Sequence, residues 1–129
     1  MSQDKVVALR PNDRVCQDAE PISTICRNLG AATAEKVVVR ALGEISQSVA
    51  GLANQVKAHD LDEMMRPLRR LQRMSESLGL VTLGLIAADL IHCITYQDVT
   101  AFSAVWARLL RVADMALVEG HNPMGLTQA

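Results

Sequence analysis

The sequence is poor in aromatic residues, with one Phe, one Tyr and one Trp among 129 residues. Strands favour aromatic and β-branched side chains, so this scarcity disfavours a core built on a sheet. Half of the residues are nevertheless hydrophobic, and aliphatic side chains are the ones that pack between helices. The composition and length therefore predict one helical domain with one core.

Long apolar runs and cysteine motifs are also missing. Thr82, Asp89 and His92 interrupt the most apolar stretch, residues 78–94, which leaves it short of the ~20 apolar residues of a membrane helix. The three cysteines form no C-x-x-C pair and have no histidine at ligand spacing, so neither a zinc site nor a disulfide framework is indicated. The polar start of the chain does not indicate a signal peptide. We expect a cytoplasmic protein with reduced thiols, no membrane contact and no metal or other cofactor.

The chain as a whole carries almost no net charge, but one segment is strongly basic. A formal net charge of -1 gives no general attraction to a phosphate backbone, so no nucleic-acid partner is expected. Four arginines nevertheless stand close together with no acid among them. They are Arg66, Arg69, Arg70 and Arg73. The basic character of this protein is therefore local.

The arginines belong to a segment with a helical pattern, from Asp60 to Gly79. Its apolar seam has steps of three and four residues, which predicts a helix with one buried face and one arginine face. The seam consists of Leu61, Met64, Leu68, Leu71, Ser75 and Leu78. Asp60 is the expected N-cap and Gly79 the expected stop. Pro67 predicts either a kink near Met64 or a fresh helix start at Arg66.

Helical periodicity also fills most of the remaining chain. The other predicted helices run from Ile22 to Leu29, from Thr33 to His59, from Leu80 to Thr95, and from Asp98 to Gly120. Thr33 and Asp98 are expected to cap helix starts, and Gly30 is expected to end the first helix. Residues 1–14 and 121–129 lack periodicity and are predicted to be tails. Residues 15–120 thus predict an all-α, antiparallel up-down four-helix bundle with a short N-terminal lid helix.

Three predicted helix ends and one apolar helix follow one another in a recognisable order. They are the His59-Asp60 turn, the Leu78-Gly79 pair, the apolar helix from Leu80 to Thr95, and the Gln97-Asp98 turn. This order resembles histidine-containing phosphotransfer (HPt) domains, which read as a Gly-Asp turn, a His-x-x-Lys-Gly motif, a Leu-Gly pair, an apolar helix and a final turn with Asp. The resemblance implies a helical bundle that works in a two-component phosphorelay.

The chain departs from this pattern where the family carries its chemistry. Counted from either anchor, Arg69 occupies the position of the phospho-accepting histidine, Gln72 that of the lysine and Arg73 that of the glycine. A neutral imidazole is a nucleophile that can accept a phosphoryl group. Arginine stays protonated and only donates hydrogen bonds. The resemblance therefore implies a pseudo-phosphotransferase, which is not an enzyme.

The resemblance also implies a partner. In the family, the face around the histidine docks a receiver domain whose phosphorylation pocket is lined by carboxylates, and a guanidinium can engage a carboxylate through two bonds. We expect this face to bind a response-regulator receiver or a sensor kinase. The predicted partner-binding residues are Arg66, Arg69, Arg70, Gln72, Arg73 and Glu76. On charge alone, the arginines would form a solvated surface with partial pairing to Asp62 and Glu76.

Two other interpretations remain open. The chain could be an active phosphotransferase that uses another histidine, His59 or His92, since His121 lies in the predicted tail. It could instead be a structural homodimer with apolar residues outside the seams at its interface. The candidates for that interface are Val37, Val39 and Met65. Asp60, Asp62 and Glu63 are interpreted as a helix start rather than a cation site.

Overall fold

The computed structural model describes the backbone of residues 16–119 and the side chains of residues 16–116. Every regular element in this part of the chain is helical, which confirms the all-α prediction. The elements are α2 (Glu20–Leu29), α3 (Ala31–Lys57), the short 3-10 helix η1 (Asp62–Met64), α4 (Met65–Ser77), α5 (Val81–Thr95) and α6 (Val99–Glu119). The predicted stop at Gly120 lies outside the described residues.

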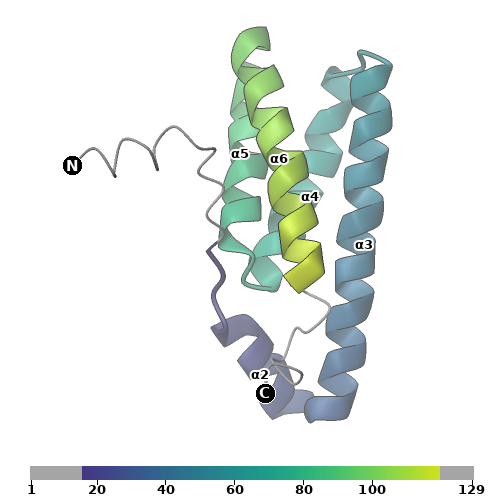
Figure 1. Cartoon of the computed structure of the whole chain (residues 1–129), viewed down its shortest axis with the longest axis vertical. Coiled ribbons are helices and arrows are strands. Elements are labelled where there is room, and N and C mark those ends of the chain that lie inside the picture. The colour runs from purple at the N-terminus through teal and green to yellow at the C-terminus, as the bar shows by residue number, and fades with distance from the viewer. Residues whose placement is uncertain (1–15, 120–129) are drawn as a thin grey trace, which may run out of the picture.

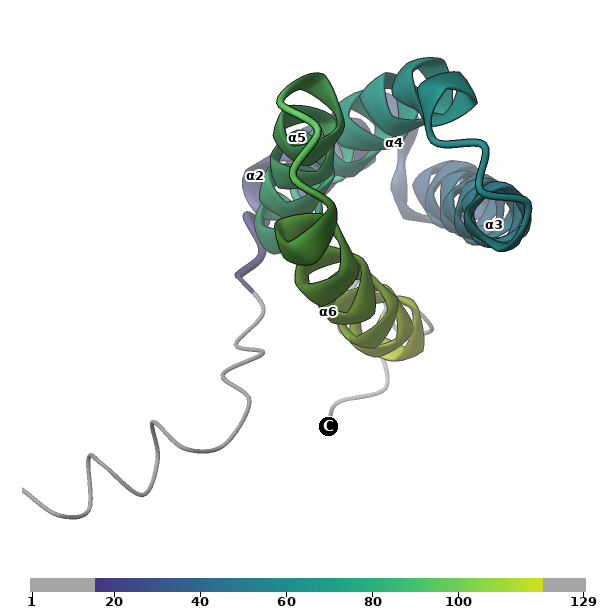
Figure 2. The same ribbon diagram turned by 90° about the horizontal axis from the view of Figure 1, so that it is seen from above.

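Helices α3, α4, α5 and α6 lie side by side along the long axis of the molecule (Figure 1). α4 packs against α5, α5 against α6, and α3 against both α4 and α6, so the four helices surround a common core, as the view from above shows (Figure 2). α2 packs mainly against the first part of α3 and has no buried residue. The short first helix therefore forms a hairpin arm with α3.

The core consists of the aliphatic seams that the sequence predicts. Its fully buried large side chains are Val38, Ile45 and Leu52 of α3, Met64 of η1, Leu68 and Leu71 of α4, Leu83, Ile86 and Leu90 of α5, and Leu109 and Val112 of α6. Burying one such side chain contributes about 1.5–3 kcal/mol. This core fixes which face of each helix remains for solvent and partners.

Three helices end in the same way. After α3, α4 and α5, a residue with positive φ is followed by an amide that donates back across the last turn: Asp60 to the Gln55 carbonyl, Leu80 to that of Ser75, and Asp98 to that of Cys93, at 2.8–2.9 Å. The positive-φ residues are His59 (57°), Gly79 (76°) and Gln97 (56°). This is the Schellman arrangement, which satisfies carbonyls at a helix end.

The predicted caps were partly right. Gly30 ends α2 at φ 81°, and Asp98 Oδ1 accepts the amide N–H of Ala101 at 3.0 Å. The prediction for Thr33 was wrong, because α3 begins at Ala31 directly after Gly30 and has no side-chain cap. The prediction for Asp60 was also wrong, because η1 begins at Asp62 after Leu61 with no side-chain cap, and the Asp60 amide belongs to the end of α3.

Pro67 lies in the first turn of α4, which begins at Met65 after η1. An amide at this position would lack an intrahelical partner, so the missing N–H of proline costs little. The predicted fresh helix start is therefore confirmed, one residue before Arg66.

The segment before α2 binds to the turn between α4 and α5. The amide of Asp18 donates to the Gly79 carbonyl at 2.7 Å, and the amide of Thr82 donates to the Cys16 carbonyl at 3.2 Å. The Cys16 amide in turn donates to Thr82 Oγ1 at 2.7 Å. A Cβ at Gly79 would collide with the Asp18 carbonyl oxygen. Glycine is thus required here both for its positive φ and for this close approach.

Candidate functional site

The side chains of the four α4 arginines are exposed. None of them makes an ion pair or a hydrogen bond within residues 16–116. The pairing expected with Asp62 and Glu76 is not formed. Glu76 instead accepts a hydrogen bond from Gln72 Nε2 at 3.3 Å. The guanidinium groups are therefore available to an external anion.

The six predicted partner-binding residues divide between two grooves. The groove between α4 and α5 has a volume of about 340 Å³. Its walls are Arg69, Gln72, Arg73 and Glu76 of α4 with Ala88 and Ile91 of α5. Four of the six predicted residues thus share one surface, which we call the α4/α5 groove.

Arg66 and Arg70 lie on the other flank of α4. They line a larger groove beside α3, of about 570 Å³. The division follows from helix geometry, because consecutive residues are rotated by about 100° and residues four apart return to one side. Arg66 therefore pairs with Arg70, and Arg69 with Arg73, so the sequence prediction of one arginine face needs this refinement.

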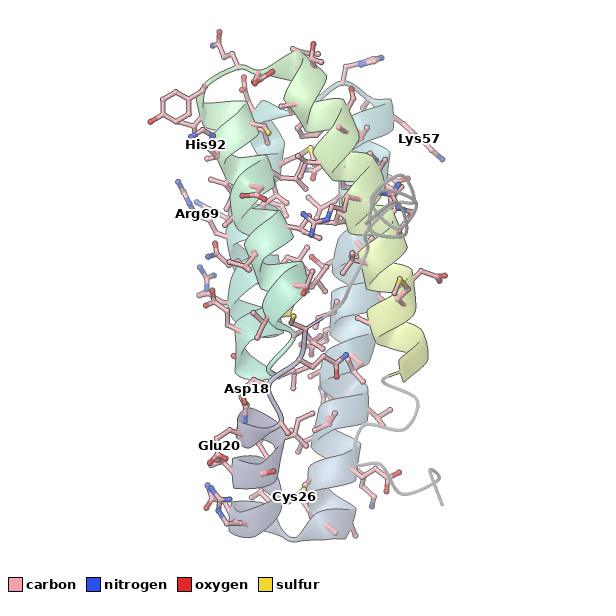
Figure 3. The ribbon with its side chains drawn as sticks, turned by 60° about the vertical axis from the view of Figure 1, so that its left-hand side comes forward. Asp18, Glu20, Cys26, Lys57, Arg69 and His92 are labelled. Carbon is pink, nitrogen blue, oxygen red and sulfur yellow. The ribbon has the colours of Figure 1, made fainter. Side chains whose placement is uncertain are left out.

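Arg69 is exposed in the second turn of α4. Figure 3 shows its side chain directed away from the core. A guanidinium at this position can hold an anion through several hydrogen bonds but cannot form a covalent phosphoryl intermediate.

The two histidines in the described residues are not on α4. His59 is in the turn after α3 and is exposed. His92 is exposed in the last turn of α5, where its ring centroid is 4.4 Å from that of Tyr96. Figure 3 shows His92 and Arg69 on the same side of the molecule. His121 lies outside the described residues.

Next to the α4/α5 groove, α5 carries a surface feature that the sequence interpretation missed. Val81, Leu85 and Tyr96 are exposed apolar or aromatic side chains, with 62% of Leu85 and 69% of Tyr96 accessible. Together with Ala88 and His92 they recur every three or four residues, so they share one face of α5, which Tyr96 continues directly after the helix. We call this face the α5 stripe. The sequence pattern that indicates the α5 stripe is a second set of apolar residues at helical spacing, beside the set that is buried in the core.

The α4/α5 contact is close because two small residues meet there. A Cβ added at Gly84 would lie 3.7 Å from Ser75 Cβ. Ser75 is fully buried, and its hydroxyl has no hydrogen-bond partner within the described part of the chain. Its role at this contact is to allow close packing.

The other predicted surface residues were exposed only in part. Val37 and Val39 are exposed on α3. Met65 is half-buried at the start of α4, because it lies on the same side of the helix as the buried Leu68 three residues later. As an exposed interface residue it was therefore predicted wrongly.

The described cysteines are dispersed. Cys16 is exposed, Cys93 is buried, and no disulfide links them to each other or to Cys26. Burial, followed by the nearby charges of Asp98 and Asp89, raises the pKa of the Cys93 thiol above its ordinary value of 9.0. Its thiolate is therefore disfavoured, and so is nucleophilic chemistry at this residue.

The described residues contain neither a metal-binding cluster nor a membrane-spanning helix. No group of three or more His, Cys, Asp or Glu side chains is placed to bind a metal ion there. No helix in the same part of the chain combines the length and apolar character needed to cross a membrane.

Comparisons of the chain with protein-family models, with curated proteins and with solved structures found no match. The resemblance to HPt domains therefore rests on the order of the sequence features.

Proposed function

We propose that this protein is an HPt-like pseudo-phosphotransfer module, which binds a response-regulator receiver domain or a sensor kinase of a cytoplasmic phosphorelay without carrying phosphate. The observation that carries the proposal is Arg69. It is exposed, unpaired within the described residues and in the second turn of α4, at the position where the resemblance expects a nucleophilic histidine.

The architecture supports this reading. An HPt-type module would be an antiparallel up-down four-helix bundle, and in Figure 1 the chain reverses direction from α3 to α4, from α4 to α5 and from α5 to α6. The connections are short, as such a bundle needs.

The surface chemistry supports a protein partner at the α4/α5 groove. Arg69 and Arg73 are one helical turn apart and can both reach carboxylates of a docked receiver. The α5 stripe beside them offers apolar area, at about 25 cal/mol per Å² buried. Charge complementarity gives specificity and fast association, while apolar burial holds the complex together.

Receiver binding tests the proposal. Receiver domains and sensor kinases from the same cell are passed over immobilised wild-type protein and over the Arg69→Glu/Arg73→Glu variant. We expect wild type to retain at least one receiver and the variant to lose it by tenfold or more in affinity, since two attractive contacts become repulsive. The matched control, Arg40→Glu/Lys57→Glu, reverses two exposed charges on α3 and should bind like wild type.

Two outcomes would contradict the proposal. One is that wild type retains no receiver and no sensor kinase. The other is that the α4 variant and the α3 control bind equally well.

The exposed His92 favours one alternative, because it lies on the same side as Arg69 (Figure 3). If the chain is an active phosphotransferase, a radiolabelled phosphorylated receiver will transfer acid-labile label to wild type and not to the His92→Ala or His59→Ala variant. The proposed module takes up no label.

A further inference from the structure

The larger groove, between α3 and α4, is separate from the surface discussed above. Arg66, Pro67 and Arg70 form its α4 wall, and the α3 wall includes Gln47, Ser48 and Gln55. Gln55 Nε2 donates to the Glu63 carbonyl at 3.2 Å, which joins the two walls at one end. The space of about 570 Å³ falls within the usual range for small-molecule sites.

The electrostatics of this groove favour an anion. Arg66 and Arg70 are about 6 Å apart along the helix axis, and neither makes an ion pair or a hydrogen bond within the described residues. The only acid that lines this described groove is Glu44. Within the described residues it makes no ion pair with either arginine. Two guanidinium groups and one carboxylate therefore line the groove, which leaves it a net positive charge.

The remaining lining gives hydrogen-bonding capacity and open space. The amide of Gln47 and the hydroxyl of Ser48 can both donate and accept hydrogen bonds. A Cβ added at Gly51, which lines the groove, would meet no atom within 4 Å. Glycine in a helix costs about 1 kcal/mol relative to alanine, and here it leaves the space beside α3 unfilled.

The lining also indicates what kind of anion would fit. Two guanidinium groups one turn apart match the several oxygens of a phosphate or diphosphate group. Protein-binding surfaces usually present aromatic or apolar anchors, but none of the large apolar side chains exposed in the described residues lines this groove.

We infer that the α3/α4 groove binds a phosphate ester of about mononucleotide size, with its phosphate groups on Arg66 and Arg70 and its body against Gln47, Ser48 and Pro67. This site is independent of the proposed receiver surface, because the two grooves use different arginine pairs.

The test is a titration of the full-length chain with ADP and, separately, with inorganic phosphate, followed by calorimetry and by amide NMR shifts. ADP is expected to bind saturably, more tightly than inorganic phosphate, with shifts concentrated in residues 44–55 and 66–70. Affinity should fall about tenfold or more in Arg66→Gln/Arg70→Gln, which removes the charges. It should fall similarly in Gly51→Leu, which fills the space without changing charge.

The matched control is Arg69→Gln/Arg73→Gln, which removes the same charge from the other flank of α4 and should bind ADP like wild type. The inference is overturned if ADP shows no saturable binding up to about 10 mM, where a millimolar site would be mostly occupied. It is also overturned if inorganic phosphate binds as tightly as ADP, or if the control loses as much affinity as the groove variants. Receiver binding by Arg66→Gln/Arg70→Gln reports separately on the proposed function.

Discussion

At the scale of single residues, Ser75 shows how the α4/α5 contact is made. Its side chain is fully buried, and its hydroxyl has no partner in the described part of the chain. A buried polar group without a hydrogen bond costs about 1–3 kcal/mol. Ser75 is small enough to let Gly84 approach, and alanine would be small enough as well.

We therefore expect Ser75→Ala to raise the free energy of unfolding by about 1 kcal/mol, because it removes an unsatisfied hydroxyl and leaves only a small void. Urea denaturation measures the change. Ser77→Ala is the matched control, since the exposed Ser77 hydroxyl donates to the Arg73 carbonyl at 2.9 Å and its removal should change stability little. A loss of stability in Ser75→Ala would show that the hydroxyl has a partner after all.

Cys93 gives a second prediction at this scale. Its thiol pKa is raised in the folded chain, chiefly by burial, so the unfolded chain loses this proton at a lower pH than the folded chain does. The contribution of Cys93 to stability is constant below about pH 9 and is lost as pH rises through the folded pKa.

The comparison of wild type with Cys93→Ala isolates this effect. Between neutral pH and pH values above 9, we expect wild type to lose more unfolding free energy than the variant loses. Parallel stability profiles for the two proteins would show that Cys93 ionises alike in the folded and unfolded chains.

At the scale of helices, the interiors were predictable from the sequence and the ends were not. The seam through Val38, Ile45 and Leu52 predicted the buried face of α3, because apolar residues spaced alternately three and four apart all lie on one face of a helix. The predicted end of α3 at His59 lies two residues after the observed end at Lys57. The predicted start of the next helix at Asp60 was wrong, since the Schellman end of α3 uses the amide of Asp60. Left-handed residues other than glycine, such as His59 and Gln97, give no clear signal in sequence.

These helix ends also explain the features that carry the resemblance. The His59-Asp60, Leu78-Gly79 and Gln97-Asp98 pairs are all parts of Schellman ends. Such ends are common in helical proteins. Their order therefore supports a bundle of consecutive helices more strongly than it supports one family.

The helix ends lead to a prediction about backbone conformation. His59→Gly and Gln97→Gly are each expected to stabilise the fold by about 0.5–1 kcal/mol, because glycine adopts positive φ without the Cβ penalty. Gly79→Ala should destabilise it by about 2 kcal/mol or more, through both the positive φ and the collision with the Asp18 carbonyl. Thermal and urea unfolding measure these changes, and a destabilised His59→Gly would contradict the account of the α3 end.

At the scale of the whole molecule, the candidate site could be predicted only in part. Sequence spacing identified the four arginines, but their division between two grooves depends on which neighbours flank α4. The α5 stripe was missed because the buried periodicity of the same helix dominates its pattern. The contact of Cys16 and Asp18 with the α4–α5 turn was missed as well, because it joins residues far apart in the chain.

We propose that Arg69 occupies the place of a phospho-accepting histidine. Arg69→His/Gln72→Lys/Arg73→Gly restores the family motif at that place, so its imidazole nitrogen could take the phosphoryl group from the aspartyl phosphate of a receiver. The control, Arg70→His, puts a histidine on the other flank of α4.

The most direct measurement is the transfer of acid-labile radiolabel from a phosphorylated receiver domain to each protein. We expect label on the restored variant and none on wild type or on Arg70→His. Label on wild type, or none on a restored variant that remains folded by circular dichroism, would contradict it.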